Sequence, residues 1–370
     1  IEAILQVQPA ERRHVGPIAD VIERGAQALG WQHAHVLQRN AAGCDGQGLC
    51  QFGCPTGAKQ STLQSVVPAA LARGASLISG ARATRLLRKG DQVQGVCIVD
   101  EDGRERQVHA RSTVLAMGSL LTPAFLQAQG VRLPWLGRNL SVHPAGAVSA
   151  WFPGESFGNS QVIPQGFGVS DLAEAGILFE GATPPLPALG ALAPQLGRDF
   201  ADTVDRYPET AWFGFMIRDT SRGQVRHIPG LPFPWVSYRM NGEDFRRFRY
   251  AQQKLGELFF AAGARSLQLP GYEAEPEITS VEQLRQCLAR SRTPADFLVS
   301  AYHPLGTCRL GLGTGQGVCD PTHRVFGLHN LYVMDGSSVP SALGANPQVT
   351  IMALALRSAR QLAERLSHEA

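Results

Sequence analysis

Two residues near the carboxyl end of the sequence have types and surroundings that could serve acid–base chemistry. His303 stands beside a proline in a glycine-rich turn, and an imidazole can exchange a proton near neutral pH. Asn346 is followed by Pro347, an order typical of an N-cap and a first helical residue. The next amides, at Gln348 and Val349, would lack partners inside the helix and could bind an anion or a dipole. Taken alone, both features are more typical of a packed histidine and an ordinary capped helix.

Three cysteines, Cys44, Cys50 and Cys54, lie in one glycine-rich loop. Three soft thiolates at this spacing suit an iron–sulfur cluster. A zinc site would want a fourth ligand, and no further Cys or His follows closely on the carboxyl side. Reduced thiols that line a pocket, or a single disulfide, are the alternatives. The seven cysteines as a whole are odd in number and unevenly spread, which argues against a disulfide scaffold.

Hydrophobic periodicity and turn residues predict the elements that would position these side chains. Helices are predicted over residues 16–29, 61–71, 123–129, 243–261 and 346–366. Strands are predicted over residues 93–99, 113–116 and 328–333. The first strand ends at a hairpin turn over 100–103, the second is expected to be buried, and Pro68 is expected to kink or shorten its helix.

Composition sets the limits of the fold and of the partners. The 370 residues suffice for two domains, and 44% hydrophobic with 18% charged residues is typical of a globular chain. A net charge of +3 is too small to favour nucleic acid as a partner. The two long uncharged stretches both contain glycine and proline, so no membrane span is predicted. An aromatic-rich middle region with many glycines and prolines predicts a second, sheet-rich domain.

Several of these motifs resemble the glucose–methanol–choline (GMC) flavoprotein oxidoreductases, and the resemblance covers nearly the whole chain. Three segments of this sequence resemble the C-terminal signature of the family: His303–Gly311, Asn330–Pro340 and Gly344–Ala355. Their second signature is similar to Gly118–Pro123 with Leu126 and Gly130, although Gln129 stands where serine is usual. The sequel of that signature matches Gly137–Pro144.

The resemblance implies an α/β (α+β) two-domain fold. Residues 1–138 and 303–370 would form an incomplete, Rossmann-like FAD-binding domain, and residues 139–302 a sheet-based substrate-binding domain. The implied activity is oxidation of the CH–OH group of an alcohol, sugar or sterol-like substrate by hydride transfer to flavin N5. His303 would be the base, and Asn346 would hydrogen-bond the same substrate oxygen.

The resemblance also implies a set of cofactor contacts. The residues expected to bind FAD are Ala83, Ala116, Gly118, Asp335, Gly336, Pro347, Gln348 and Val349. The cysteine loop is similar to that of cytochrome-coupled sugar dehydrogenases of the family, which implies a 3Fe-4S cluster and a cytochrome or other electron acceptor. Long-chain alcohol oxidases and other bacterial members have similar cysteine-rich loops.

One family feature is missing from the sequence. In these proteins a GxGxxG turn binds the FAD pyrophosphate, and the sequence from Ile1 to Ala41 contains no such turn. We therefore expect a fragment that lacks roughly the first hundred to two hundred family residues. A dehydrogenase is favoured because a cluster would relay electrons. The alternatives are an oxidase or lyase of the same family, or a non-catalytic remnant that needs a separate N-terminal chain.

Overall fold

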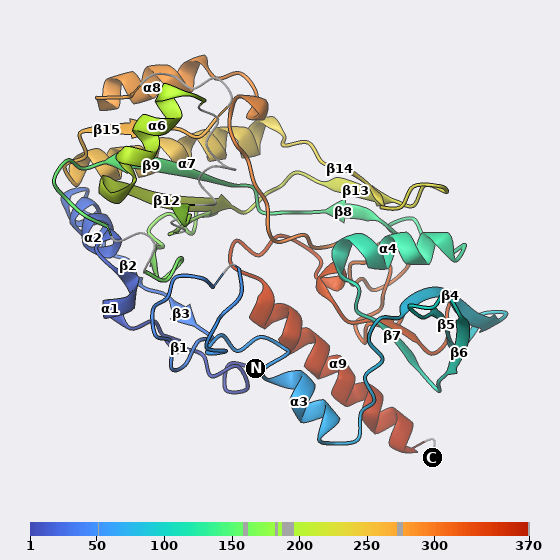
Figure 1. The fold of residues 1–370 in the computed structure, drawn as a ribbon. Helices are drawn as coiled ribbons and strands as arrows, with labels where there is room; N and C mark the ends of the chain where they lie inside the picture. Colours follow the sequence, from blue (N-terminus) through green and yellow to red (C-terminus); the bar gives the residue numbers. More distant parts are fainter. Residues whose placement is uncertain (51, 158–161, 182–183, 187–195, 272–276, 369–370) are drawn as a thin grey trace.

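The fold is a mixed α/β arrangement of several sheets, as the sequence predicts (Figure 1). The computed structural model describes residues 1–50, 52–157, 162–181, 184–186, 196–271 and 277–368. The largest sheet and its helices occupy one half of the molecule, and the long helix α9 (Gln348–His368) runs through the other half to the C-terminus. Among the described residues, no helix has both the length and the apolar character that crossing a bilayer requires.

The largest sheet has six antiparallel strands in the order β15–β9–β12–β11–β10–β2. These strands span Ser266–Gln268, Ala145–Trp151, Thr210–Ile217, Ile177–Glu180, Phe167–Val169 and Ala34–Val36. Because side chains alternate along a strand, the sheet has two different faces. One face carries large apolar residues, among them Val148, Phe179, Phe213 and Phe215. The opposite face, which we call the open face, carries Ala147, Glu180, Trp212, Gly214 and Met216.

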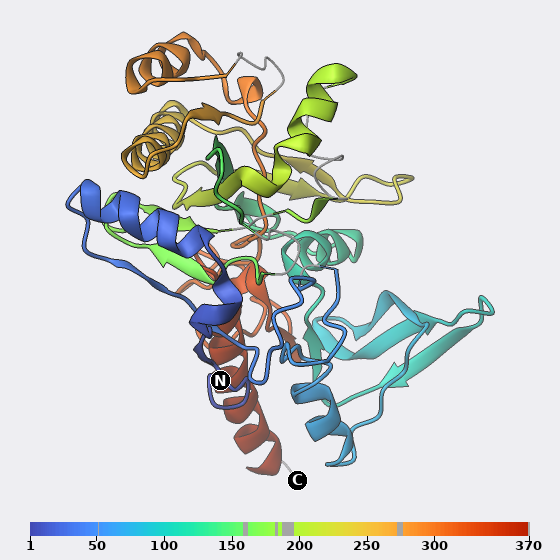
Figure 2. The ribbon, with the colours of Figure 1, turned by 60° about the vertical axis from the view of Figure 1, so that its left-hand side comes forward.

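Helices cover the apolar face of the sheet and form the main core with it. They are α2 (Ile18–Ala28), α7 (Gly242–Ala261) and α8 (Val281–Arg290). Figure 2 shows α2, α7 and α8 stacked beside the sheet. The predicted helices 16–29 and 243–261 are thereby confirmed within two residues at each end. The Asn241 side chain caps α7 by accepting a hydrogen bond of 2.8 Å from the Asp244 N–H.

A second part of the fold is built on two parallel strands. The strand β7 (Thr113–Leu115) pairs with β16 (Leu331–Val333), so the predicted strands 113–116 and 328–333 lie side by side. Leu115 is buried, but Val114 is 42% exposed, so the expected burial of the first strand holds on one face only. The predicted hairpin is also confirmed, in a separate sheet of β4 (Arg82–Lys89), β5 (Gln92–Val99) and β6 (Glu105–His109).

Two observed helices begin at other residues than predicted, and each contains a proline. The helix predicted over 61–71 is only α3 (Val66–Leu71), which places Pro68 in its first turn, where its missing N–H costs no hydrogen bond. The helix predicted over 123–129 is α4 (Gly118–Ala128), with Pro123 in its interior. Pro123 leaves the carbonyl of Ser119 without its helical donor, and the Thr307 hydroxyl donates to that carbonyl at 2.7 Å instead. A long-range contact thus supports a helix that local rules would shorten.

The amino-terminal residues lie with the large sheet. The strand β2 forms its edge beside β10, and Ile18, Val21 and Ile22 of α2 are buried in the core between the sheet and α7. The sheet of the middle region is therefore completed by residues that precede position 40. A sequence-based division at residue 139 separates these contacting elements.

Candidate active site

His303 lines a cavity of about 230 Å³ on the open face of the sheet. The loop that carries it is tied to the start of α4, because the Ser119 hydroxyl donates a hydrogen bond of 2.5 Å to the Pro304 carbonyl. Gly306 in this loop has φ +88°, and a Cβ at this position would lie 2.6 Å from the carbonyl oxygen of Asn139. Glycine is therefore required where the loop passes the neighbouring backbone.

The surroundings of His303 favour the neutral form of its imidazole. Its Nδ1 atom is buried and has no hydrogen-bond partner among the described residues. Burial, followed by the neighbouring imidazole of His143, lowers the pKa of His303 to about 4. A neutral imidazole is the form that can accept a proton, so the protonation state of His303 is compatible with the role of a base.

His143 lies against His303 and links it to the loop before α9. The Nε2 atom of His143 accepts hydrogen bonds from the N–H groups of Leu343 at 2.9 Å and Gly344 at 3.0 Å. These two donors assign the proton of the neutral ring to Nδ1. Burial lowers the pKa of His143, which also favours its neutral form. His143 therefore fixes the segment that leads to Asn346.

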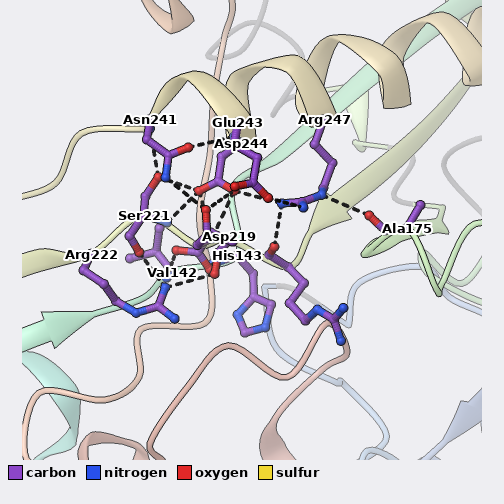
Figure 3. A network of polar contacts seen from close by, with 12 residues as sticks. Val142, His143, Ala175, Asp219, Ser221, Arg222, Asn241, Glu243, Asp244 and Arg247 are labelled. Carbon is purple, nitrogen blue, oxygen red and sulfur yellow. Dashed lines mark hydrogen bonds and ion pairs between the residues drawn. The ribbon is translucent and has the colours of Figure 1, made fainter.

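A buried carboxylate network holds the backbone at His143 (Figure 3). Asp219 accepts hydrogen bonds from the N–H groups of Val142 at 3.2 Å and His143 at 3.1 Å. Behind it, the buried Asp244 accepts from the Ser221 N–H at 2.7 Å and from the Ser221 hydroxyl at 2.5 Å. His143 has φ +52°, a conformation that side-chain-bearing residues seldom adopt, and this network provides the hydrogen bonds that hold it.

Asn346 approaches the same cavity through Glu180. The Asn346 Nδ2 atom donates a hydrogen bond of 2.8 Å to Oε2 of Glu180, and Glu180 lines the cavity together with His303. Asn346 itself is not one of the residues that line this cavity. The two candidate catalytic residues thus come from different loops and are related through a buried carboxyl group of β11.

The residues expected to face FAD are divided between two places. Gly118 follows β7 at φ +80°, and a Cβ there would meet no atom within 4 Å, so its backbone borders open space. Asp335 follows β16, and its carboxylate accepts from the Gly118 N–H at 2.9 Å, the Thr122 hydroxyl at 2.6 Å and the Ser337 N–H at 2.8 Å. The carboxyl ends of two parallel strands are thereby joined, which is where α/β folds bind cofactors.

The remaining expected cofactor residues are placed as follows. Gly336 is packed so closely that a Cβ would lie 3.2 Å from the Ile351 side chain, which brings the first turn of α9 to the end of β16. Ala116 is exposed just beyond β7. Ala83 lies in β4 of the separate antiparallel sheet, opposite Ile98 of β5. α9 begins with Gln348 and Val349, directly after the buried Pro347.

The three clustered cysteines do not form a metal site in this structure. Among the described residues, which omit position 51 of this loop, no group of three Cys, His, Asp or Glu side chains converges on one point. All three thiols are free. Cys44 and Cys50 pack against the apolar core of the sheet, whereas the Cys54 sulfur accepts a hydrogen bond from the Lys59 N–H at 3.4 Å. The geometry therefore gives no support to the predicted iron–sulfur cluster.

A larger cavity of about 330 Å³ lies on the same open face, and Trp212 lines both cavities. Its described lining residues include no histidine, and the charged ones among them are Asp199, Asp202, Arg206 and Glu277, of which the last two form an ion pair of 2.8 Å. We place the candidate active site in the smaller cavity because that cavity contains His303.

Sequence reasoning missed Glu180 and assigned no catalytic role to His143. The signal for Glu180 was weak but present, since it is a lone charged residue that ends the apolar strand Ile177–Glu180. Its alternation with Phe179 would place it on the face opposite the core. Nothing local to His143 indicates that Leu343 and Gly344, two hundred positions later, donate to its ring.

Comparison with known proteins agrees with this geometry. Models of the GMC oxidoreductase N- and C-terminal regions match residues 1–145 and 219–355. An uncharacterized GMC-type oxidoreductase of Mycobacterium tuberculosis is 34% identical over 363 residues, 97% of this chain and 57% of the relative. A long-chain-alcohol oxidase of Arabidopsis thaliana is 26% identical over 380 residues, 94% of this chain and 50% of the relative.

A solved structure shows the same fold. The crystal structure of pyridoxine 4-oxidase from Mesorbium loti superposes with a TM-score of 0.70 at 22% identity, over 97% of this chain and 72% of that one. The chain spans about half the length of the two relatives whose sequences are compared above. The two regional matches include both the start of α4 and the His303 loop. The chain belongs to the GMC oxidoreductase family.

Proposed function

We propose that the protein oxidises the CH–OH group of a small alcohol in an FAD-dependent reaction, with His303 as the base. The observation that carries this proposal is the position of His303 in the wall of a cavity large enough for a small molecule, where burial lowers the pKa of its imidazole. Membership of the GMC oxidoreductase family supports it. The similarity to a long-chain-alcohol oxidase of Arabidopsis thaliana supports it as well.

In this proposal, side chains of the protein bind the substrate hydroxyl group and accept its proton. His303 accepts the hydroxyl proton at Nε2, because its Nδ1 atom is buried. Asn346 uses one Nδ2 hydrogen for Glu180 and keeps the other for the substrate oxygen. His143 keeps both groups in place through its contact with His303 and its hydrogen bonds to the loop before Asn346. The apolar walls of the cavity exclude water and strengthen these contacts.

The residues at the ends of β7 and β16 fit a role in holding FAD, which supplies the acceptor for two electrons when it is bound. Gly118 leaves its backbone beside open space, and Gly336 lets the start of α9 approach that backbone. Asp335 has both oxygens engaged by this chain, so its role is to hold the loop. Gln348 and Val349 present the amides of the first turn of α9, where a polar group of the cofactor is favoured.

The two-domain division is part of the proposal. Residues 303–370 and the region around β7 and α4 form the cofactor-binding unit. The strands of residues 139–302 form the substrate-binding unit, and α2 and β2 are assigned to it because they pack in its core and sheet.

We propose dioxygen as the electron acceptor. The preference for a dehydrogenase depends on a cysteine-bound cluster, and the thiols do not converge among the described residues. The relative and the solved structure with named substrates are both called oxidases.

The test is turnover of primary alcohols by the FAD-loaded protein, followed by oxygen uptake and, separately, by reduction of an artificial dye. Oxygen uptake that disappears in the His303→Ala variant supports the proposal. Dye reduction without oxygen uptake would leave the base assignment intact and make the protein a dehydrogenase. Absence of both, in protein that retains FAD, would reject the proposed function.

A further inference from the structure

A third cavity, of about 450 Å³, lies at the end of α4 that is remote from Gly118. Its walls come from Gln127 of α4, from the loop over residues 131–138, and from the paired strands β8 (Arg138–Leu140) and β13 (Gly223–Arg226). Figure 1 shows α4, β8 and β13 together on one side of the molecule. None of its described lining residues lines the candidate active site or is expected to contact FAD. The cavity is therefore a separate site.

The charged side chains that line this cavity all have one sign. They are Arg132, Arg138 and Arg226, and His227 adds an imidazole, so we call it the arginine cavity. No Asp or Glu is among its described lining residues, and none of the three guanidinium groups forms an ion pair within the described part of the chain. Clustered charges of one sign in a concave site raise the local concentration of ions of the opposite sign. The arginine cavity thus favours an anion.

Neutral oxygens hold two of these arginines in place without cancelling their charge. Arg226 donates from Nε and Nη2 to Oε1 of Gln224, at 3.1 and 2.7 Å. Arg132 donates from Nη1 to the carbonyl of Gln127 at 3.4 Å. The Arg138 side chain has no hydrogen-bond partner among the described residues. Since a guanidinium group has five N–H donors, each of the three keeps donors for a ligand.

The backbone around the arginine cavity is fixed by Gln127. Its Nε2 atom donates to the carbonyls of Val225 at 3.0 Å and Leu136 at 3.2 Å, and its Oε1 atom accepts from the His227 N–H at 2.6 Å. Gly137 has φ +78°, and a Cβ there would lie 2.2 Å from the Val225 carbonyl oxygen, so only glycine lets the loop pass β13. The walls are held before a ligand arrives, which lowers the cost of binding one.

A phosphate group fits these donors better than a carboxylate group does. Guanidinium groups bind phosphate oxygens through paired hydrogen bonds. A phosphate monoester has three terminal oxygens and a charge of about −2 at neutral pH, so several arginines can share it. A carboxylate has two oxygens and a single charge, which suits one arginine.

An aromatic side chain lies next to the arginine cavity. Trp235 of β14 (Trp235–Ser237) is directly opposite Arg226 in the hairpin of β13 and β14, and it is 55% exposed. Side chains directly opposite each other in an antiparallel pair share one face. The indole therefore lies on the same face as the Arg226 guanidinium, where it can contact an organic group attached to the phosphate.

We propose that the arginine cavity binds the phosphate group of an organic molecule through Arg132, Arg138 and Arg226. Two sources can supply this chemistry, a free organophosphate and the headgroup of a phospholipid. The inference is independent of the proposed function, because the arginine cavity and the cavity of His303 share no described lining residue.

Calorimetric titration with sn-glycerol 3-phosphate tests the site, with malonate as a dicarboxylate of similar charge. The unmodified protein should bind glycerol 3-phosphate more tightly than malonate. Arg138→Gln should raise the Kd for glycerol 3-phosphate about tenfold or more, the usual worth of a charge-assisted hydrogen bond. This substitution breaks no hydrogen bond among the described residues. The matched control is Arg360→Gln, which removes an equal charge from an exposed position of α9 and should leave the Kd unchanged.

Flotation with vesicles distinguishes the two sources. One set of vesicles contains phosphatidylcholine alone, and the other also contains phosphatidic acid, whose phosphate is a monoester. Flotation that requires phosphatidic acid and is lost in Arg138→Gln and in Trp235→Ala would identify the headgroup of a lipid. Binding of glycerol 3-phosphate without flotation would identify a free organophosphate. No binding to either probe, equal affinity for malonate, or equal losses in Arg138→Gln and Arg360→Gln would overturn the inference.

Discussion

The imidazole rings of His143 and His303 lie edge to face, with centroids 5.6 Å apart and planes at 85°. Two imidazolium ions at this distance would repel each other, so the pair favours states with at most one charge. The N–H groups of Leu343 and Gly344 already require an unprotonated Nε2 on His143. At neutral pH the backbone therefore favours the uncharged form of His143, and as the pH falls, the charge that His143 gains opposes protonation of His303.

The first prediction concerns the base. His303→Ala should lower kcat/KM of the FAD-loaded protein by about 10² to 10⁴, the usual contribution of a general base. FAD content should stay the same, because among the described residues this ring makes no hydrogen bond to Gly118 or Asp335. Steady-state rates and the visible flavin spectrum measure the two effects. A rate within about threefold of the unmodified protein would show that His303 is not the base.

The second prediction is a pH profile. Because the pKa of His303 is about 4, His303 is neutral and active above that value, and kcat/KM should fall only as the pH drops through it. An ordinary histidine would lose activity near pH 6.5. In His143→Gln the charge of the neighbouring imidazole is absent, so the acid limb should move to higher pH, but remain below 6.5 because burial persists.

A matched control exists for this substitution. His323 is likewise fully buried, has φ +68° and has a lowered pKa, and its ring contacts the Val333 carbonyl at 2.7 Å. His323→Gln should therefore perturb the fold to a similar extent but leave the acid limb where it is. An equal movement of the limb in both variants would mean that general loosening, not the His143–His303 contact, sets the profile.

How much of this site the sequence predicts depends on the range of the contacts. The helix 243–261 and the hairpin after residue 99 follow from local periodicity and turn residues, and both are confirmed. The start of α4 does not follow from local rules, because Pro123 predicts a later start. The Thr307 hydroxyl, which replaces the helical donor that Pro123 lacks, lies far along the chain. The sequence does not predict the place of Glu180 in the site for the same reason, since its partner Asn346 and its cavity are brought together only by the tertiary fold.

The third prediction tests the compensation at Pro123. Thr307→Val removes the hydroxyl that satisfies the Ser119 carbonyl and should lower the free energy of unfolding by about 1–3 kcal/mol, the cost of a buried unsatisfied group. In a Pro123→Ala background, a helical N–H is available to the same carbonyl, so the loss should be smaller. Denaturant unfolding of the four proteins of this double-mutant cycle gives the coupling.

The control for that cycle is Thr203→Val in α6 (Arg198–Asp205), which removes a hydroxyl-to-carbonyl bond of 2.8 Å at an exposed site. Water can replace that donor, so the change in unfolding free energy should stay within about 0.5 kcal/mol. Equal losses from Thr307→Val with and without Pro123 would show that the hydroxyl does not act as a substitute for the missing helical donor.

The fourth prediction concerns FAD. The sequence contains no GxGxxG turn, which in dinucleotide-binding folds lets the backbone and a helix start approach the pyrophosphate. We expect this 370-residue chain by itself to bind FAD weakly, through the residues at the ends of β7 and β16. Flavin fluorescence during titration measures the affinity. Stoichiometric FAD that survives gel filtration would contradict this expectation.

The last prediction distinguishes free thiols from a cluster at Cys44, Cys50 and Cys54. The backbone N–H of Lys59, assisted by the Thr56 hydroxyl, holds the pKa of Cys54 below its usual value, whereas burial raises the pKa of Cys50. Since the thiolate is the reactive form, iodoacetamide at pH 7.5 should alkylate Cys54 faster than Cys50. Thr56→Val should slow the reaction of Cys54, and peptide mass spectrometry resolves the three sites.

A three-iron cluster would instead protect all three thiols together and give about three irons per chain on metal analysis of anaerobic protein. Either of those results would restore the ligand role that the geometry does not support.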